Sequence, residues 1–163
     1  MPVIGIDEAG RGALAGPVVV AAVRIPPRFY PRAAHLPIRR AADIASTQSL
    51  IRLLRLTRSP LSECFIYLDG GLSILDEVLV NKLGHRIKTV IRGDEKLVAI
   101  KLGSIVAKVT RDNYMLKLHE RYPSYGLNLH KGYGTALHGR RIKRFGPAEI
   151  HRLTYLRKSF TIT

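Results

Sequence analysis

The sequence predicts an α/β protein in which a mixed β-sheet is flanked by helices. Short apolar runs typical of buried strands alternate along the chain with longer segments whose apolar residues recur at helical spacing. Hydrophobic residues make up 46% of the 163 residues, which is enough for the packed core of one domain. We therefore expect residues 1–163 to form a single domain.

Four apolar runs are the expected strands, and they cover residues 3–6, 18–23, 65–68 and 87–91. The glycine-rich segment Gly10-Arg11-Gly12 predicts a turn between the first two strands. Four prolines within residues 26–40 predict a loop after the second strand.

Four helices are expected, over about residues 48–57, 72–83, 98–119 and 135–145. Ser46 or Thr47 can cap the first helix, and Gly84 can end the second. Residues 122–126 break the third helix, and Gly146-Pro147 ends the last.

Acidic residues follow three of the expected strands: Asp7 and Glu8, Asp69, and Asp94. Ligands bind at the carboxyl ends of strands in α/β sheets, and carboxylates gathered there repel one another unless cations neutralise them. Mg²⁺ prefers such oxygen ligands, and two ions about 4 Å apart can promote phosphodiester cleavage. Consecutive strand residues point to opposite faces, so Asp7 and Glu8 share a site only if the strand ends or bulges between them.

Each acidic position also has a structural interpretation. Asp69 precedes Gly70-Gly71 and fits a turn, Asp94 fits a cap of the long helix, and tandem acids are commonly solvated. Spacing by itself leaves both interpretations open.

The chain is strongly basic, with a net charge of +15. Residues 96–163 hold 14 of the 27 Lys and Arg residues but 3 of the 12 Asp and Glu residues. This charge favours a nucleic-acid partner, although a ribosome-bound or histone-like structural protein is equally basic.

The remaining composition is typical of a reduced, cytoplasmic protein. Cys64 is the single cysteine, so no internal disulfide and no multi-cysteine zinc site can form. No apolar run approaches the roughly 20 residues of a membrane-spanning helix, and the acids at positions 7 and 8 argue against a secretory leader. We expect no membrane partner.

Several motifs occur together in one order along about two thirds of the chain. They are Gly5–Gly12 with Leu14–Pro17, Leu68–Gly70, Gly93-Asp94 with Ser104–Asp112, His130–Thr135, Gly146-Pro147 and Ile150–Arg152. In this combination the chain resembles the type 2 ribonucleases H. The resemblance implies a ribonuclease-H-like mixed sheet flanked by helices.

The resemblance also implies a function. The expected activity is endonucleolytic cleavage of RNA in RNA–DNA hybrids and at ribonucleotides embedded in duplex DNA, 5′ to the ribonucleotide. By matching position, the catalytic, metal-binding carboxylates are Asp7, Glu8, Asp69 and Asp94, and the expected metal is Mg²⁺ or Mn²⁺. Asp112 lies in a matched segment and is expected to be structural.

The expected nucleic-acid contacts also come from matching positions. Gly10, Arg11 and Gly12 correspond to the loop that reads the 2′-hydroxyl, a group that distinguishes RNA from DNA. Tyr133 corresponds to the tyrosine that stacks on the next sugar, and weaker candidates for phosphate contacts or site support are Lys131, Ser104 and Lys108. Each candidate also has a structural alternative: an ordinary turn for Gly10–Gly12, a half-buried aromatic at a helix start for Tyr133, and solvated surface positions for the remaining candidates. His138 and His151 are candidates for proton transfer or for structural roles.

Two features differ from the family pattern. Ala45–Gln48 stands where the family carries Asp-Ser-Lys, and the chain is shortened between about residues 49 and 64. We expect a monomer unless this shortening exposes core, in which case self-association would cover it. The alternative functions are a non-catalytic hybrid-binding module and another ribonuclease-H-like nuclease such as a junction resolvase.

Overall fold

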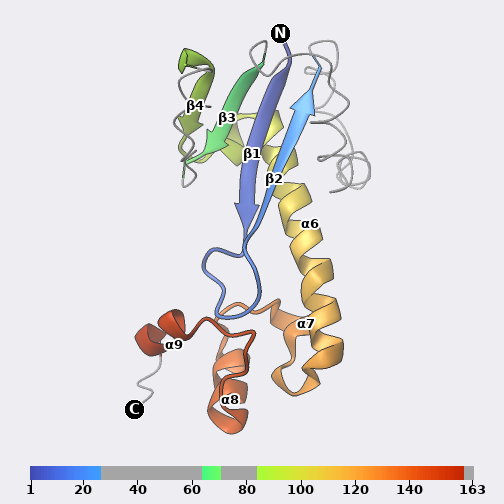
Figure 1. The fold of residues 1–163 in the computed structure, drawn as a ribbon, viewed down its shortest axis with the longest axis vertical. Coiled ribbons are helices and arrows are strands. Elements are labelled where there is room, and N and C mark those ends of the chain that lie inside the picture. The colour runs from blue at the N-terminus through green and yellow to red at the C-terminus, as the bar shows by residue number, and fades with distance from the viewer. Residues whose placement is uncertain (27–63, 71–83, 160–163) are drawn as a thin grey trace. The chain divides into compact units, whose positions relative to one another are not determined.

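The computed structural model describes residues 1–26, 64–70 and 84–159, drawn as ribbon in Figure 1. Its contacts divide the chain into two compact units, which we call the sheet unit (residues 1–9 and 20–109) and the helical unit (residues 10–19 and 110–163). The single domain expected from the sequence stays a prediction.

The sheet has four strands in the order β2-β1-β3-β4. Their bounds are Val3–Ala9 (β1), Val19–Ile25 (β2), Phe65–Asp69 (β3) and Ile87–Val90 (β4). β3 pairs in parallel with both β1 and β4, whereas the arrow of β2 runs opposite to that of β1 in Figure 1. The predicted mixed sheet is therefore confirmed.

Three strands are longer than predicted. β1 continues through Asp7 and Glu8 to Ala9, β2 begins at Val19 and continues to Ile25, and β3 includes Asp69. The sequence pattern placed strand ends at the first polar residues, but side-chain polarity does not stop a backbone ladder from continuing.

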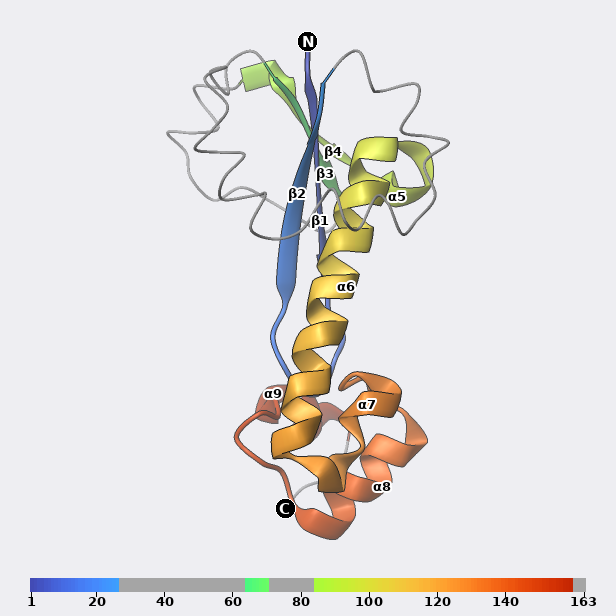
Figure 2. The same cartoon turned by 90° about the vertical axis from the view of Figure 1, so that its right-hand side faces the viewer.

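Close packing of a long helix against β1 positions the sheet unit's polar residues. The short helix α5 (Gly93–Lys96) precedes α6 (Val98–Arg121), whose first part lies along β1 and β2 in Figure 2. A Cβ atom at Gly5 would lie 2.0 Å from the carbonyl carbon of Ala99, and one at Gly103 would lie 3.3 Å from the backbone nitrogen of Asp7. Glycines at both positions let the two backbones approach.

A small apolar cluster packs on the sheet. Its buried members are Ile4, Cys64 and Ile66, with Ile6, Ala22 and Ile87 partly buried against them. The register pairs Ile6 with Leu68 and Asp69 with Val90.

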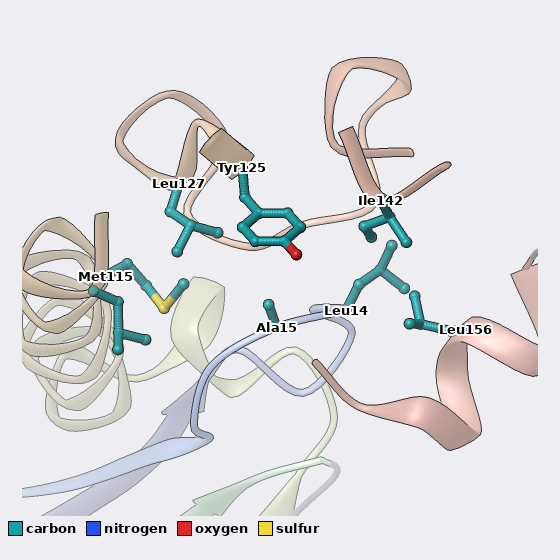
Figure 3. Packing of buried hydrophobic residues seen from close by; sticks show 8 residues of the cluster. Leu14, Ala15, Met115, Tyr125, Leu127, Ile142 and Leu156 are labelled. Atoms are coloured by element: carbon teal, nitrogen blue, oxygen red, sulfur yellow. The ribbon is translucent and has the colours of Figure 1, made fainter. Parts of the chain in front are cut away.

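The helical unit contains short helices around its own core. After α6 come the 3₁₀ helix η4 (Pro123–Tyr125), α7 (Leu127–His130), α8 (Ala136–Phe145) and α9 (Leu153–Ser159). The core shown in Figure 3 contains Leu14, Ala15, Met115, Leu118, Tyr125, Leu127, Ile142 and Leu156. Thr135 caps α8 by accepting a hydrogen bond from the backbone N–H of His138.

Both predicted helices that fall on described residues are confirmed, and three short α-helices were missed. The predictions over 98–119 and 135–145 correspond to α6 and α8, whereas α5, α7 and α9 had no prediction. Gly84 opens a 3₁₀ turn, η3 (Gly84–Arg86). The expected loop over 26–40 past Pro26, the helices over 48–57 and 72–83, and the segments 45–48 and 49–63 lie outside the described residues.

Among the helices of the described segments, none is both long and apolar enough to cross a membrane.

Candidate active site and nucleic-acid-binding loop

Asp7 and Asp69 belong to neighbouring parallel strands of the sheet unit. They follow directly on the paired residues Ile6 and Leu68, at the carboxyl ends of the matched segments. Asp7 is 6% exposed, and Asp69 is the last residue of β3. The register therefore places the two carboxylates at the same edge of the sheet.

Asp94 is joined to this edge through the backbone. Oδ1 of Asp69 accepts a 2.7 Å hydrogen bond from the N–H of Gly93, the first residue of α5. Asp94 follows in the first turn of α5, and Leu97 separates α5 from α6. The alternative interpretation of Asp94 as a cap of the long helix is therefore wrong.

The pKa of Asp7 is raised above its ordinary value, mainly by burial of the carboxyl group. The negative charges of Asp69 and Asp94 raise it further. Hydrogen bonds from the Glu8 backbone N–H, at 2.7 Å, and from the Ser104 side chain act in the opposite direction. Asp69 and Asp94 therefore act electrostatically on Asp7, and Ser104 orients Asp7 from α6.

Glu8 lies next to Asp7 within a continuous strand. Because β1 runs through both residues, the strand does not end between them, and a bulge is the remaining way for both side chains to share a site. The Oε2 atom of Glu8 is buried. A metal-binding role for Glu8 stays a prediction.

The acids suit a divalent cation by their chemistry. All are hard oxygen donors, and the repulsion that raises the pKa of Asp7 is relieved by a positive ion. Within residues 1–26, 64–70 and 84–159, however, no three acidic, His or Cys side chains are grouped closely enough to hold a metal ion. The charges of Asp69 and Asp94 thus act on Asp7, but these carboxylates do not form a closed metal-binding site among the described residues.

The Gly10-Arg11-Gly12 segment forms the predicted turn in the helical unit. Gly10 has φ +91°, and a Cβ atom there would lie 1.9 Å from Nε of Arg111. Gly10 is therefore required both by its left-handed backbone and by the guanidinium packed against it. At Gly12 a Cβ atom would have no neighbour within 4 Å.

Arg111, which sequence reasoning did not single out, lies against this loop. It is 1% exposed and donates to the carbonyls of Pro17 at 3.0 Å and Ala15 at 3.1 Å. Burial lowers its pKa, and the charges of Tyr133 and Asp112 partly offset this effect. Its guanidinium carbon lies 4.9 Å from the centre of the Tyr133 ring. Arg111 thus contacts two predicted nucleic-acid-binding elements at once.

The other predicted contact residues have varied surroundings. Tyr133 is 39% exposed and lies just before α8, which agrees with the alternative of a half-buried aromatic at a helix start and leaves its stacking role a prediction. The Lys131 ammonium donates to the Asn128 carbonyl, and Lys108 is an exposed residue of α6. Ser104 hydrogen-bonds the Asp7 carboxylate, which fits support of the acidic site and not a phosphate contact.

His138 and His151 are buried, which confirms the structural interpretation of both. His138 Nδ1 lies 3.0 Å from the Tyr133 carbonyl, and the two Nε2 atoms are 3.2 Å apart. A carbonyl only accepts, so His138 donates from Nδ1, and its Nε2 accepts from His151. The Ala148 N–H donates to His151 Nδ1 at 3.0 Å. Burial lowers the pKa of His138 to about 4, so its imidazole is neutral at pH 7.

Comparison with known proteins gives a consistent result. The family model described as Ribonuclease HII matches residues 4–37 and 39–162. The ribonuclease HII of Synechococcus elongatus is 35% identical over 95% of this chain and 85% of its own length. That of Rhizobium etli is 37% identical over 97% of this chain and 80% of its own.

Solved structures share the fold at lower identity. The ribonuclease H2 of Pyrococcus horikoshii has a TM-score of 0.61 at 20% identity, covering 97% of this chain and 96% of its own. The ribonuclease HII of Archaeoglobus fulgidus, solved in complex with PCNA, has a TM-score of 0.63 at 22% identity, covering 96% and 94%. From the match over nearly its whole length and from these relatives, the chain belongs to the ribonuclease HII family of type 2 ribonucleases H.

Proposed function

We propose that this protein is an endonuclease that cleaves RNA in RNA–DNA hybrids and at single ribonucleotides within duplex DNA. Cleavage falls on the phosphate 5′ to the ribonucleotide and leaves a 3′-hydroxyl and a 5′-phosphate. The observation that carries the proposal is the convergence of negative charge on Asp7 from Asp69 and Asp94, in a chain of this family.

The proposed metal ligands are Asp7, Glu8, Asp69 and Asp94, with Mg²⁺ or Mn²⁺ as the ion. A solved structure of Bst-RNase HIII, similar in fold to this chain with a TM-score of 0.55, contains Mn²⁺. A bound divalent cation supplies a Lewis acid that neutralises phosphate charge and makes water a better nucleophile at neutral pH.

The protein's own residues orient these acids. The Glu8 N–H and the Ser104 side chain hold the Asp7 carboxylate through hydrogen bonds, and the Gly93 N–H holds that of Asp69. Fixed carboxylates lose little freedom on binding a cation, which favours a defined geometry.

Most of the proposed nucleic-acid contacts belong to the helical unit, where Gly10, Arg11 and Gly12 meet the 2′-hydroxyl, Tyr133 stacks on a sugar and Lys131 contacts a phosphate. Lys108, in the α6 portion of the sheet unit, is a further proposed phosphate contact. The excess of Lys and Arg over residues 96–163 favours binding of a polyanion. Cytoplasmic location and a monomeric state stay expectations.

A nicking assay tests the proposal. The full chain is incubated with Mg²⁺ and a labelled duplex containing one ribonucleotide, beside Asp94→Asn and the matched control Glu95→Gln. Glu95 is an exposed neighbour in α5 that pairs with Arg92. We expect metal-dependent nicking 5′ to the ribonucleotide by the wild type and by Glu95→Gln, and none by Asp94→Asn.

Two results would contradict the proposal. Tight binding of the hybrid without product would favour a non-catalytic binding module. An all-DNA duplex cut as readily as the ribonucleotide-containing one would favour a nuclease of the junction-resolvase type.

A further inference from the structure

Arg152 lies between the Ile150-His151 segment and α9, and its side chain contacts the carbonyls of the Gly10–Gly16 loop. Nη1 donates to the carbonyls of Gly10 at 2.8 Å and Arg11 at 2.9 Å. Nε and Nη2 donate to the carbonyl of Gly16 at 3.1 and 2.8 Å. The Arg152 backbone N–H also donates to the Leu14 carbonyl at 2.8 Å. One side chain therefore fixes three peptide groups of the loop.

These contacts set the direction of two backbone N–H groups. The described residues contain no cis peptide bond, and in a trans peptide the N–H points opposite to the C=O. The C=O groups of Gly10 and Arg11 share their peptides with the N–H groups of Arg11 and Gly12. With both carbonyls directed at Arg152, both N–H groups are directed away from its guanidinium.

The space beside Gly12 is open. Gly12 is exposed, and an added Cβ atom would have no neighbour within 4 Å. A ligand can therefore approach the backbone of the turn closely. Two successive N–H groups on the side of the turn away from the guanidinium suit an oxygen acceptor such as a hydroxyl or a phosphate.

Arg152 has a geometry that lysine lacks. The guanidinium is a planar fork of donors that spans several carbonyls at once, whereas an ammonium is a compact charge on a flexible chain. Arg111 reaches the later carbonyls of Ala15 and Pro17 and leaves those of Gly10 and Arg11 to Arg152. The two arginines thus hold different carbonyls of the loop.

We propose that Arg152 is a positioning residue for ribonucleotide selectivity: by holding the Gly10 and Arg11 carbonyls, it directs the Arg11 and Gly12 N–H groups toward the 2′-hydroxyl of the substrate. This inference rests on the proposed function, in which the loop meets a ribonucleotide. It assigns selectivity to a residue that need not touch the nucleic acid.

The test compares two dissociation constants by fluorescence anisotropy in EDTA, where metal-dependent cleavage is blocked. The two ligands are a duplex with one ribonucleotide and the same duplex made of DNA alone, and their ratio is the selectivity. The variant is Arg152→Lys, which keeps the charge. The control is Arg157→Lys, which changes an exposed arginine of α9.

We expect Arg152→Lys to lower the selectivity by about three- to tenfold, the equivalent of roughly one net hydrogen bond. Affinity for the all-DNA duplex should stay near that of the wild type because the charge is unchanged. Arg157→Lys should keep the wild-type ratio. A parallel loss of affinity for both duplexes, with the ratio unchanged, would show a merely structural role and overturn the inference.

A second variant keeps the inference testable if Arg152→Lys does not fold. Gly12→Pro removes the N–H itself at an exposed position and should lower the selectivity to a similar extent. In the double variant the Arg152→Lys effect should be smaller than in the wild-type background, because Gly12→Pro removes one of the two donors that Arg152 directs. An unchanged ratio in Gly12→Pro would overturn the inference.

The wild type separates this inference from the proposed function. If the wild type does not distinguish the two duplexes and does not nick, the proposed function fails and the inference fails with it. If the wild type prefers the ribonucleotide and Arg152→Lys keeps that preference, the proposed function stands and the inference alone is overturned.

Discussion

The backbone N–H of Gly93 donates a 2.7 Å hydrogen bond to Oδ1 of Asp69, although the two residues are 24 positions apart. The bond links the end of β3 to the first residue of α5, where Asp94 follows. A Cβ atom at Gly93 would lie 2.4 Å from Cδ1 of Ile100 and 3.2 Å from that Asp69 oxygen. Asp69 therefore has a structural role in addition to its proposed role as a metal ligand.

This dual role of Asp69 can be separated by two substitutions. Asp69→Asn removes the charge but keeps an oxygen that accepts from Gly93, so stability should change little while nicking falls at least about 100-fold. Asp69→Ala removes both and should also lower the free energy of unfolding by about 1–2 kcal/mol. Urea unfolding and nicking rates measure the two effects. Equal destabilisation by Asn and Ala would contradict the hydrogen-bond role.

Repulsion among the acids predicts how metal ions affect stability. Because burial and the charges of Asp69 and Asp94 raise the pKa of Asp7, Asp7→Asn should raise the melting temperature at neutral pH in EDTA. Mg²⁺ should raise the melting temperature of the wild type through binding to the folded state, and should have less effect on Asp7→Asn. Glu95 is an exposed acid of α5 that is not a proposed metal ligand, so the Glu95→Gln variant should respond to Mg²⁺ like the wild type. A wild type insensitive to Mg²⁺ up to millimolar concentration would contradict a metal site at these acids.

Two glycines of one turn should differ sharply in their tolerance of alanine. At Gly10 an alanine would have to adopt φ +91°, and its methyl group would lie 1.9 Å from Nε of Arg111. Gly10→Ala should therefore lower the free energy of unfolding by about 2–4 kcal/mol. At Gly12 a methyl group has no neighbour within 4 Å, and Gly12→Ala should leave stability within about 0.5 kcal/mol. Chemical unfolding monitored by circular dichroism compares the two, and similar losses would refute the packing described for Gly10.

The buried histidines predict acid sensitivity. The pKa of His138 falls from 6.5 to about 4 on folding, mainly through burial. Between these values the unfolded chain binds more protons, so stability rises with pH from about 4 to 6.5 and is lost as the pH falls through that window. We expect a melting temperature several degrees lower at pH 5 than at pH 7.

His138→Asn supplies the control for this pH dependence. Its amide occupies the place of Nδ1 and can still donate to the Tyr133 carbonyl, but it does not titrate. The difference in melting temperature between pH 5 and pH 7 should therefore shrink, with His130 and His151, whose pKa values are also lowered by burial, supplying the remainder. An undiminished difference would mean that other groups dominate.

Local patterns were sufficient for the longer elements. The run at 65–68 and the helical spacing over 98–119 and 135–145 predicted β3, α6 and α8, because each pattern spans enough residues for its period to be recognised. The helices α5, α7 and α9 were missed because four, four and seven residues cover at most two helical turns, too few for a periodic signal.

The sequence by itself determined the class of fold, the acids that follow the apolar part of each strand and the glycine turn, since each depends on residues that are neighbours in the chain. Only the tertiary structure decided which groups hold them in place: Gly93 on Asp69, Ser104 on Asp7, and Arg111 and Arg152 on the loop carbonyls. A guanidinium and a carbonyl 142 residues apart leave no periodic trace in the sequence. Their pairing follows from the need of buried polar groups for hydrogen-bond partners once packing has brought the segments together.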